Sequence, residues 1–178
     1  KDPAFIMMKF FVDYYRNIIT TLAPYNEKLN KGNRQFVAGL KEMLPNKKFY
    51  PNANSTMRLT YGSVKDYYPA DAVHYNYYTT LEGIMEKEDA KSEEFIVPSK
   101  LKELYIAKDY GRYGENGKMK VAFISTTDIT GGNSGSPVIN GEGQLVGLAF
   151  DGNWEAMSGD IAYEPELQRT ISVDIRYV

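Results

Sequence analysis

The chain has 178 residues, of which 43% are hydrophobic and 25% charged, with a formal net charge of −2. This composition is ordinary for a soluble globular protein with one moderate domain, or one domain and part of another. The charge is balanced and has no block of one sign, so binding to nucleic acid or to an anionic membrane surface is not expected. The absence of cysteine excludes disulfides, thiolate catalysis and cysteine-ligated metals. Because no group of His, Asp and Glu has metal-ligand spacing either, we expect neither a metal nor a cofactor.

Both ends of the sequence suggest a piece of a longer polypeptide. The chain begins at Lys1 without a methionine, and it stops at Val178 inside a strand-like pattern. The apolar run over residues 4–8 is broken by Lys9 and soon followed by Asp13. It is too short for a signal peptide or a membrane span.

The first quarter of the chain is expected to be helical. Asp2 suits an N-cap and Pro3 the first helical position. Apolar residues then recur at helical spacing, namely Phe5, Met8, Phe11, Val12, Tyr15 and Ile19. A second helix is expected from about residue 25 to residue 44, ended by Pro45 and Pro51, with one apolar face made of Leu29, Phe36, Leu40 and Leu44. These stripes predict two antiparallel helices that pack against each other.

From Ser55 onward the pattern becomes that of short strands with Gly-rich turns. We expect a charged loop over residues 87–94 and a short helix from Pro98 to about Ala107. The turn at residues 140–143, Asn-Gly-Glu-Gly, predicts a β-hairpin. Strands are expected at residues 56–61, 73–78, 121–125, 137–139, 145–150 and 171–175. The order predicts a mainly β fold with α-helices, in which a helical segment precedes a β-barrel or sandwich.

Residues 131–137, Gly-Gly-Asn-Ser-Gly-Ser-Pro, form a Gly-rich turn between two expected strands. Gly131, Gly132 and Gly135 are expected to permit the sharp backbone conformations that this turn needs. Acyl transfer by a serine needs an exposed hydroxyl on a tight turn, with backbone N–H groups directed at the developing oxyanion. In the Gly-x-Ser-Gly pattern of chymotrypsin-type enzymes these donors are the serine and the glycine two positions before it. Ser134 is therefore the candidate nucleophile, and the N–H groups of Gly132 and Ser134 are the candidate oxyanion hole. Ser136 lies outside the nucleophile position and is expected to support the turn.

The alternative for this motif is an ordinary hairpin loop without chemistry. Two features favour a serine peptidase site over such a loop. Pro137 and the strand–turn–strand after it have the layout that follows the nucleophile in this class of enzyme. Gly152, at the end of the second strand, stands 18 residues after Ser134, close to where that fold places its primary specificity pocket.

Five segments together resemble the bacterial serine dipeptidyl-peptidase 7 family. They are TDITGGNSGSP at 127–137, GLAFDGNWE at 147–155, QRTISVDIRY at 168–177, NSTMRLTYG at 54–62 and YYTT at 77–80. The resemblance covers essentially the whole chain. It implies an exopeptidase of the periplasm or cell envelope of Gram-negative bacteria, which removes dipeptides from peptides with a free N-terminus. It also implies a homodimer.

The family fold is a chymotrypsin-like double β-barrel with an inserted helical domain. By this resemblance residues 1–50 are the end of the helical domain, and residues 51–178 belong to the second barrel. Asp151 is expected to bind the substrate's α-amino group, although a turn aspartate is the alternative. Phe150 and Gly152 are expected to line the pocket. Family members with glycine at this position prefer hydrophobic residues before the cleaved bond, whereas those with arginine prefer Asp or Glu.

A serine nucleophile needs a general base, and the chain has one histidine, His74. His74 stands 60 residues before Ser134, whereas the family supplies its catalytic His and Asp from the first barrel, far upstream. We therefore expect these two residues to lie in sequence outside this chain, and the chain to be inactive alone. The candidate acids Asp66, Asp71 and Asp128 fit turns or caps better. A complete small hydrolase that uses His74 and a non-catalytic peptide-binding module remain alternatives.

Overall fold

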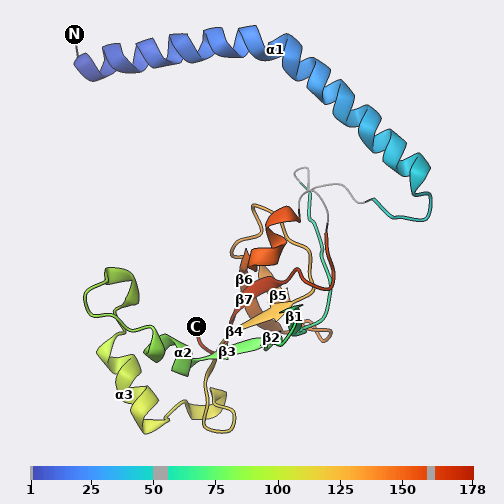
Figure 1. Cartoon of the computed structure of the whole chain (residues 1–178). Coiled ribbons are helices and arrows are strands. Elements are labelled where there is room, and N and C mark those ends of the chain that lie inside the picture. The colour runs from blue at the N-terminus through green and yellow to red at the C-terminus, as the bar shows by residue number, and fades with distance from the viewer. Residues whose placement is uncertain (1, 50–55, 160–162) are drawn as a thin grey trace. The chain divides into compact units, whose positions relative to one another are not determined.

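The computed structural model describes residues 2–49, 56–159 and 163–178. The chain divides into two compact units, residues 1–57 and 58–178, which are described separately. Among the described residues, the first contains one helix and the second contains the strands (Figure 1). The mixed helical and antiparallel β content agrees with the predicted fold class. The boundary expected at residue 50 lies outside the described residues, and the domain identities stay predictions.

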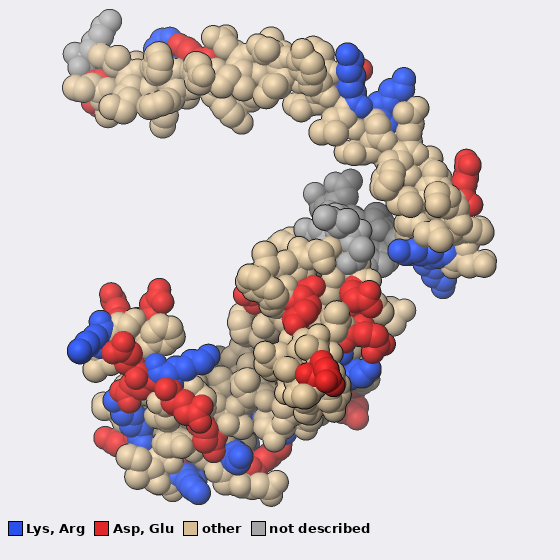
Figure 2. All heavy atoms as spheres, viewed as in Figure 1, with Lys and Arg blue, Asp and Glu red and all other residues tan. Residues whose placement is uncertain are grey.

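The first unit is the α-helix α1, Pro3–Met43. Asp2 caps it as predicted, since its Oδ1 accepts a hydrogen bond of 2.9 Å from the N–H of Ala4. The helix ends before Pro45, as expected, because a proline makes the helical conformation unfavourable for the residue that precedes it. Much of its surface carries neither acidic nor basic side chains in the view of Figure 2.

The prediction of two antiparallel helices is wrong. Pro24 lies inside α1, where its missing N–H removes one helical hydrogen bond without ending the helix. The ribbon of α1 bends part-way along (Figure 1), the usual effect of an internal proline. None of the described residues of α1 is buried, so the two apolar stripes do not pack against each other. Among the described helices, none combines the length and the apolar composition needed to cross a bilayer.

The second unit, hereafter the β unit, is built on a five-stranded antiparallel sheet in the order β3-β4-β7-β6-β5. Its strands are β3 (Tyr78–Thr80), β4 (Lys120–Ser125), β5 (Pro137–Ile139), β6 (Leu145–Gly152) and β7 (Thr170–Asp174). The strands β1 (Tyr67–Ala70) and β2 (Val73–Tyr75) form a separate ribbon. The sheet has β3 and β5 as its outer strands, and the closed barrel remains a prediction.

Short helices connect the strands of the β unit. They are α2 (Leu81–Glu86), η1 (Glu93–Phe95), α3 (Ser99–Ala107), η2 (Gly111–Tyr113) and η3 (Trp154–Ser158). The helix expected after Pro98 is confirmed as α3. Around α2 and α3 the acidic and basic side chains are interspersed in the view of Figure 2, so neither sign dominates there.

The predicted strands at 121–125, 137–139, 145–150 and 171–175 are confirmed within one or two residues as β4, β5, β6 and β7. The hairpin between β5 and β6 is also confirmed. Asn140 Oδ1 accepts from the N–H of Glu142 at 3.1 Å and from that of Gln144 at 2.9 Å, and Gly143 has a φ of +79°. A residue with a side chain is strained at such a φ, which explains the glycine.

The strand prediction at residues 56–61 is wrong, and that at residues 73–78 is confirmed only in part. Residues 56–61 alternate in polarity but pair with no strand in the described part of the chain, and Met57, Leu59 and Tyr61 are exposed. Alternation alone therefore does not establish a strand, which also has to pair with a neighbouring strand. The run 73–78 is divided between β2 and β3, because Asn76 interrupts it and its Oδ1 accepts from the N–H of Tyr77 at 2.7 Å.

The core of the β unit is small and unusually polar. Its buried apolar side chains include Leu81, Phe123 and Ala149. A methyl group on Gly147 of β6 would lie 2.6 Å from the ring of Phe123, so only glycine lets that ring pack against the strand. The buried polar residues are at least as numerous, namely Ser125, Asn153, Gln168, Arg169, Thr170, Ser172 and Asp174.

Candidate active site

The turn that carries Ser134 is held by hydrogen bonds within itself. The N–H of Asn133 donates to Thr130 O at 3.1 Å, and Asn133 Oδ1 accepts from the N–H of Thr130 at 3.0 Å. Gly132 and Gly135 have φ values of +102° and +82°, so both glycines are required by the backbone, as predicted. Gly131 is not in this left-handed region, and its expected conformational role is not supported.

The turn is tied to strand β6 directly after Ser134. The N–H of Gly135 donates to Ala149 O at 2.7 Å, and the N–H of Ala149 donates to Ser136 O at 3.0 Å. The side chain of Ser134 is exposed, and its Oγ donates to Phe150 O at 3.3 Å. A hydroxyl in this position is accessible to a ligand while its main chain is fixed by the sheet.

The two candidate oxyanion donors are unoccupied by protein acceptors. Within the described residues, neither the N–H of Gly132 nor that of Ser134 donates a hydrogen bond. Exposed N–H groups with no internal partner are available to a negatively charged oxygen. The site residues themselves remain predictions.

An open cavity of about 250 Å³ lies beside Ser134, hereafter the Ser134 cavity. One side is formed by residues 150–153 at the end of β6, and another by residues 129–131. Ala156 and Met157 of η3 complete the lining. The predicted pocket residues Phe150, Asp151 and Gly152 thus lie together with Ser134. A cavity of this size, with mixed polar and apolar lining, has room for one amino-acid side chain.

The three predicted pocket residues differ in exposure and contacts. Phe150 is 49% exposed, and Asp151 is exposed with its Oδ1 accepting from the N–H of Gly152 at 2.8 Å. That bond leaves the rest of the carboxylate at the cavity edge. Gly152 does not have a left-handed φ, so its backbone conformation does not demand glycine.

Asn153 is a pocket residue that sequence reasoning missed. Its side chain is buried and makes three hydrogen bonds: Oδ1 accepts from the N–H of Arg169, and Nδ2 donates to Leu167 O and Glu155 Oε2, each at 2.8 Å. Its main-chain N–H donates to Arg169 O at 2.9 Å. Asn153 therefore fixes the end of β6 against the segment that leads into β7.

Glu155 extends this network to the β1–β2 ribbon. Its Oε2 also accepts from the hydroxyl of Tyr67 at 3.0 Å. Burial raises the pKa of the Tyr67 phenol, and the neighbouring Glu155 carboxylate acts in the same direction. Tyr67 therefore stays a neutral donor at physiological pH.

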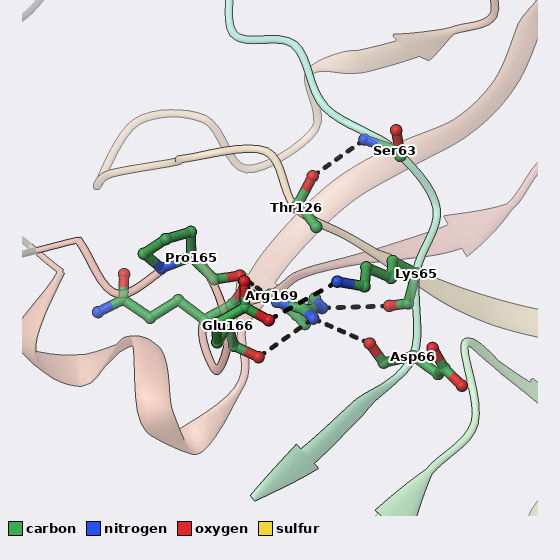
Figure 3. Close-up of polar contacts among 8 residues, drawn as sticks. Ser63, Lys65, Asp66, Thr126, Pro165, Glu166 and Arg169 are labelled. Atoms are coloured by element: carbon green, nitrogen blue, oxygen red, sulfur yellow. Dashed lines mark hydrogen bonds and ion pairs between the residues drawn. The ribbon is translucent and has the colours of Figure 1, made fainter.

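The side chain of Arg169 lies between residues 65–66 and residues 165–166, as Figure 3 shows. The residue is only 1% exposed. Its five side-chain N–H groups donate to main-chain carbonyls of residues 65, 66, 165, 166 and 168, at 2.7–3.2 Å. The guanidinium carbon also lies 5.4 Å from the centre of the Tyr67 ring. No sequence pattern marks this role, since the acceptors are main-chain oxygens that every residue has.

The sequence matches the model of the family Peptidase S46 over residues 1–178. The chain belongs to the peptidase S46 family. It is 54% identical over 178 residues to dipeptidyl-peptidase 7 of Porphyromonas gingivalis, and 50% identical over 179 residues to the Asp/Glu-specific dipeptidyl-peptidase of the same bacterium. In each case the match covers 100% of this chain and 25% of the relative.

The structure is also similar to that of another S46 relative. The crystal structure of Porphyromonas endodontalis DPP11 in complex with the dipeptide Arg-Glu matches with a TM-score of 0.83 and 48% identity, over 91% of this chain and 23% of that chain. The expected resemblance to dipeptidyl-peptidase 7 is thus confirmed. The chain spans about a quarter of the length of the S46 relatives that it matches.

His74, the residue on which the alternative of a complete small hydrolase depends, lies in β2. Its Nε2–H donates to Asp66 Oδ2 at 2.7 Å, and its ring stacks on Tyr68 at 4.5 Å. The structure therefore forms a His–Asp pair that the sequence analysis did not expect. His74 is absent from the described lining of the Ser134 cavity. No group of three or more His, Cys, Asp or Glu side chains that could hold a metal occurs among the described residues.

Replacing Arg169 by methionine is expected to destabilise the chain by at least about 3 kcal/mol, because five carbonyls in buried or part-buried hydrogen bonds lose their donors. Arg169→Lys should be intermediate, since an ammonium has three N–H groups in place of five. Urea denaturation followed by near-ultraviolet circular dichroism measures both. Arg112→Met, at an exposed arginine, is the matched control and should change little. Equal stability of Arg169→Met and this control would contradict the role of Arg169.

Proposed function

We propose that this chain is the nucleophile-bearing part of a serine-type dipeptidyl aminopeptidase. Ser134 attacks the carbonyl after the second residue of a peptide with a free N-terminus. The N–H groups of Gly132 and Ser134 stabilise the oxyanion. The observation that carries the proposal is the arrangement at Ser134: an exposed hydroxyl, two N–H groups that find no acceptor among the described residues, and an adjacent cavity lined by Phe150–Gly152.

The general base and its aspartate are proposed to come from polypeptide outside these 178 residues. The S46 relatives are about four times as long, and they are named as dipeptidyl peptidases. The missing histidine would take the proton of Ser134 Oγ and later protonate the leaving amine. An acyl-enzyme would form on Ser134 and be hydrolysed by water. We place this enzyme, as a homodimer, in the periplasm or cell envelope.

Asp151 is proposed to bind the substrate's α-amino group. Its carboxylate is exposed at the edge of the Ser134 cavity, and one oxygen is oriented by the N–H of Gly152. A cation held at a fixed distance from the nucleophile would select cleavage after two residues.

Gly152 is proposed to give a preference for hydrophobic residues before the cleaved bond. The relatives include both dipeptidyl-peptidase 7 and Asp/Glu-specific enzymes, so family membership alone does not decide the preference. Gly152 adds no charge to the cavity. Each methylene buried there contributes about 0.8 kcal/mol. An unpaired substrate carboxylate in the same cavity would be disfavoured by about 2 kcal/mol or more.

In the full-length enzyme, meaning a polypeptide of the relatives' length that contains this chain, Ser134→Ala is expected to lower kcat at least about 10⁴-fold. Ser136→Ala is the matched control and should keep most activity, because Ser136 contributes its main chain to the turn. Hydrolysis of dipeptidyl coumarylamides measures both, and a fluorophosphonate probe should label only proteins that retain Ser134. Full activity of a folded Ser134→Ala enzyme would refute the proposed function.

The isolated 178-residue chain is expected to be nearly inactive, with kcat lower by on the order of 10⁴-fold than that of the full-length enzyme, because the base is missing. The same coumarylamide assay measures this. His74→Ala should leave the residual rate unchanged. Normal turnover by the isolated chain, abolished by His74→Ala, would instead establish the small hydrolase that uses the His74–Asp66 pair.

Gly152→Arg in the full-length enzyme is expected to lower cleavage after Leu or Phe and to raise cleavage after Asp or Glu. A guanidinium in the cavity pairs with a carboxylate and excludes apolar side chains from the same space. The ratio of kcat/KM for Glu and Leu substrates measures the change, which we expect to be at least about a hundredfold. An unmodified enzyme that already prefers acidic residues would refute the pocket assignment.

A further inference from the structure

Ala156, in η3, lines the Ser134 cavity together with Gly152 and Phe150. It also lines a second, much smaller cavity of about 10 Å³, whose other lining residues include Asp128, Tyr163 and Arg169. Ala156 and Ile129 line both cavities among the described residues. The methyl group of Ala156 is therefore part of the partition that limits the depth of the Ser134 cavity.

The position of Ala156 is fixed by its neighbours. Its N–H donates to Asn153 O at 3.0 Å, and its carbonyl accepts from the N–H of Gly159 at 2.9 Å. Asn153 is itself held by its side-chain bonds to Arg169, Leu167 and Glu155. Because the main chain on both sides of Ala156 is hydrogen-bonded, the partition has little freedom to move when a larger group enters the cavity.

Ala156 also limits the space for a side chain at residue 152. A Cβ atom on Gly152 would lie 3.0 Å from the Cβ of Ala156, closer than side chains normally pack. The next nearest atom, Arg169 O, would be 3.9 Å away, at ordinary contact distance. Since the φ of Gly152 does not require glycine, the methyl group of Ala156 is the main local obstacle to a side chain at this position.

We propose that Ala156 is a specificity-determining residue of this enzyme, coupled to Gly152. Its methyl group sets the size of the side chain accepted before the cleaved bond and the ease with which residue 152 can carry a side chain. This inference rests on the proposed function, since it concerns the pocket beside Ser134. It adds that the pocket is defined by the pair at 152 and 156, so substitution of Gly152 alone converts specificity incompletely.

The first test changes the volume at residue 156 in the full-length enzyme. Ala156→Val should lower kcat/KM for a Phe substrate about tenfold relative to an Ala substrate, because the small cavity behind has no room for the added methyl groups. Ala156→Gly should shift the Phe/Ala ratio severalfold in the opposite direction. Ala107→Val, at an exposed alanine of α3, is the matched control and should leave the ratio unchanged. Thermal melts of all variants show whether each is folded.

The second test is a double-mutant cycle, which stays informative if Ala156→Val fails to fold. We expect Gly152→Arg with Ala156→Gly to cleave Glu substrates about tenfold faster than the product of the two single effects, because removal of the methyl group relieves the contact. Additive effects would overturn the coupling. An unchanged Phe/Ala ratio in folded Ala156→Gly and Ala156→Val would overturn the size limit.

Failure of this inference can be told apart from failure of the proposed function. If Ser134→Ala and the fluorophosphonate probe establish Ser134 as the nucleophile while the 156 variants leave the substrate ratios unchanged, only the inference about Ala156 is refuted. If Ser134→Ala retains activity, the proposed function is refuted, and with it the basis for assigning a role to Ala156.

Discussion

The guanidinium of Arg169 is buried, and its five N–H groups all donate to main-chain carbonyls. These carbonyls come from residues 65–66 on one side and from residues 165–168 on the other. A buried cation is tolerated only where such hydrogen bonds replace its hydration. The two segments therefore have to stay close together for as long as the unit is folded. Because Arg169 directly precedes β7, this constraint also fixes where the last strand enters the sheet (Figure 3).

The same constraint reaches the candidate active site through Asn153. Asn153 exchanges two hydrogen bonds with the main chain of Arg169, and it directly follows Gly152 in the cavity lining. Apolar packing is nondirectional, whereas hydrogen bonds fix both distance and orientation. A core in which polar residues hold one side of the cavity is thus suited to a site that needs accurate geometry. It has the corresponding weakness that the loss of one residue such as Arg169 removes the partner of several part-buried acceptors at once.

The sequence predicted the parts of this structure that local patterns determine. The β5–β6 hairpin, the glycines at 132 and 135, and the grouping of Phe150, Asp151 and Gly152 near Ser134 all depend on residues within 20 positions of one another. Chemical type and spacing suffice for the hairpin and the glycines, whereas the grouping of the pocket residues was implied by the family resemblance. The small partition at Ala156 was missed because alanine has no chemistry that a sequence pattern can mark.

The errors occurred where the outcome depends on distant partners. Pro24 either ends or bends a helix, and the local pattern does not distinguish the two. Residues 56–61 have the alternation of a strand, but among the described residues they pair with no strand. The role of Arg169 joins residues about 100 positions apart through main-chain oxygens, which have no sequence signature.

On the proposed function, catalysis divides between this chain and the rest of the polypeptide in a physically reasonable way. The nucleophile, the oxyanion donors and the specificity cavity require the finest mutual geometry, and all of them lie between residues 129 and 157 on one hydrogen-bonded framework. The base needs only to reach Ser134 Oγ within hydrogen-bond distance. In this structure that hydroxyl donates to Phe150 O at 3.3 Å, a long bond to a carbonyl. An incoming imidazole can replace such a contact at small cost, because it offers the same proton a stronger acceptor.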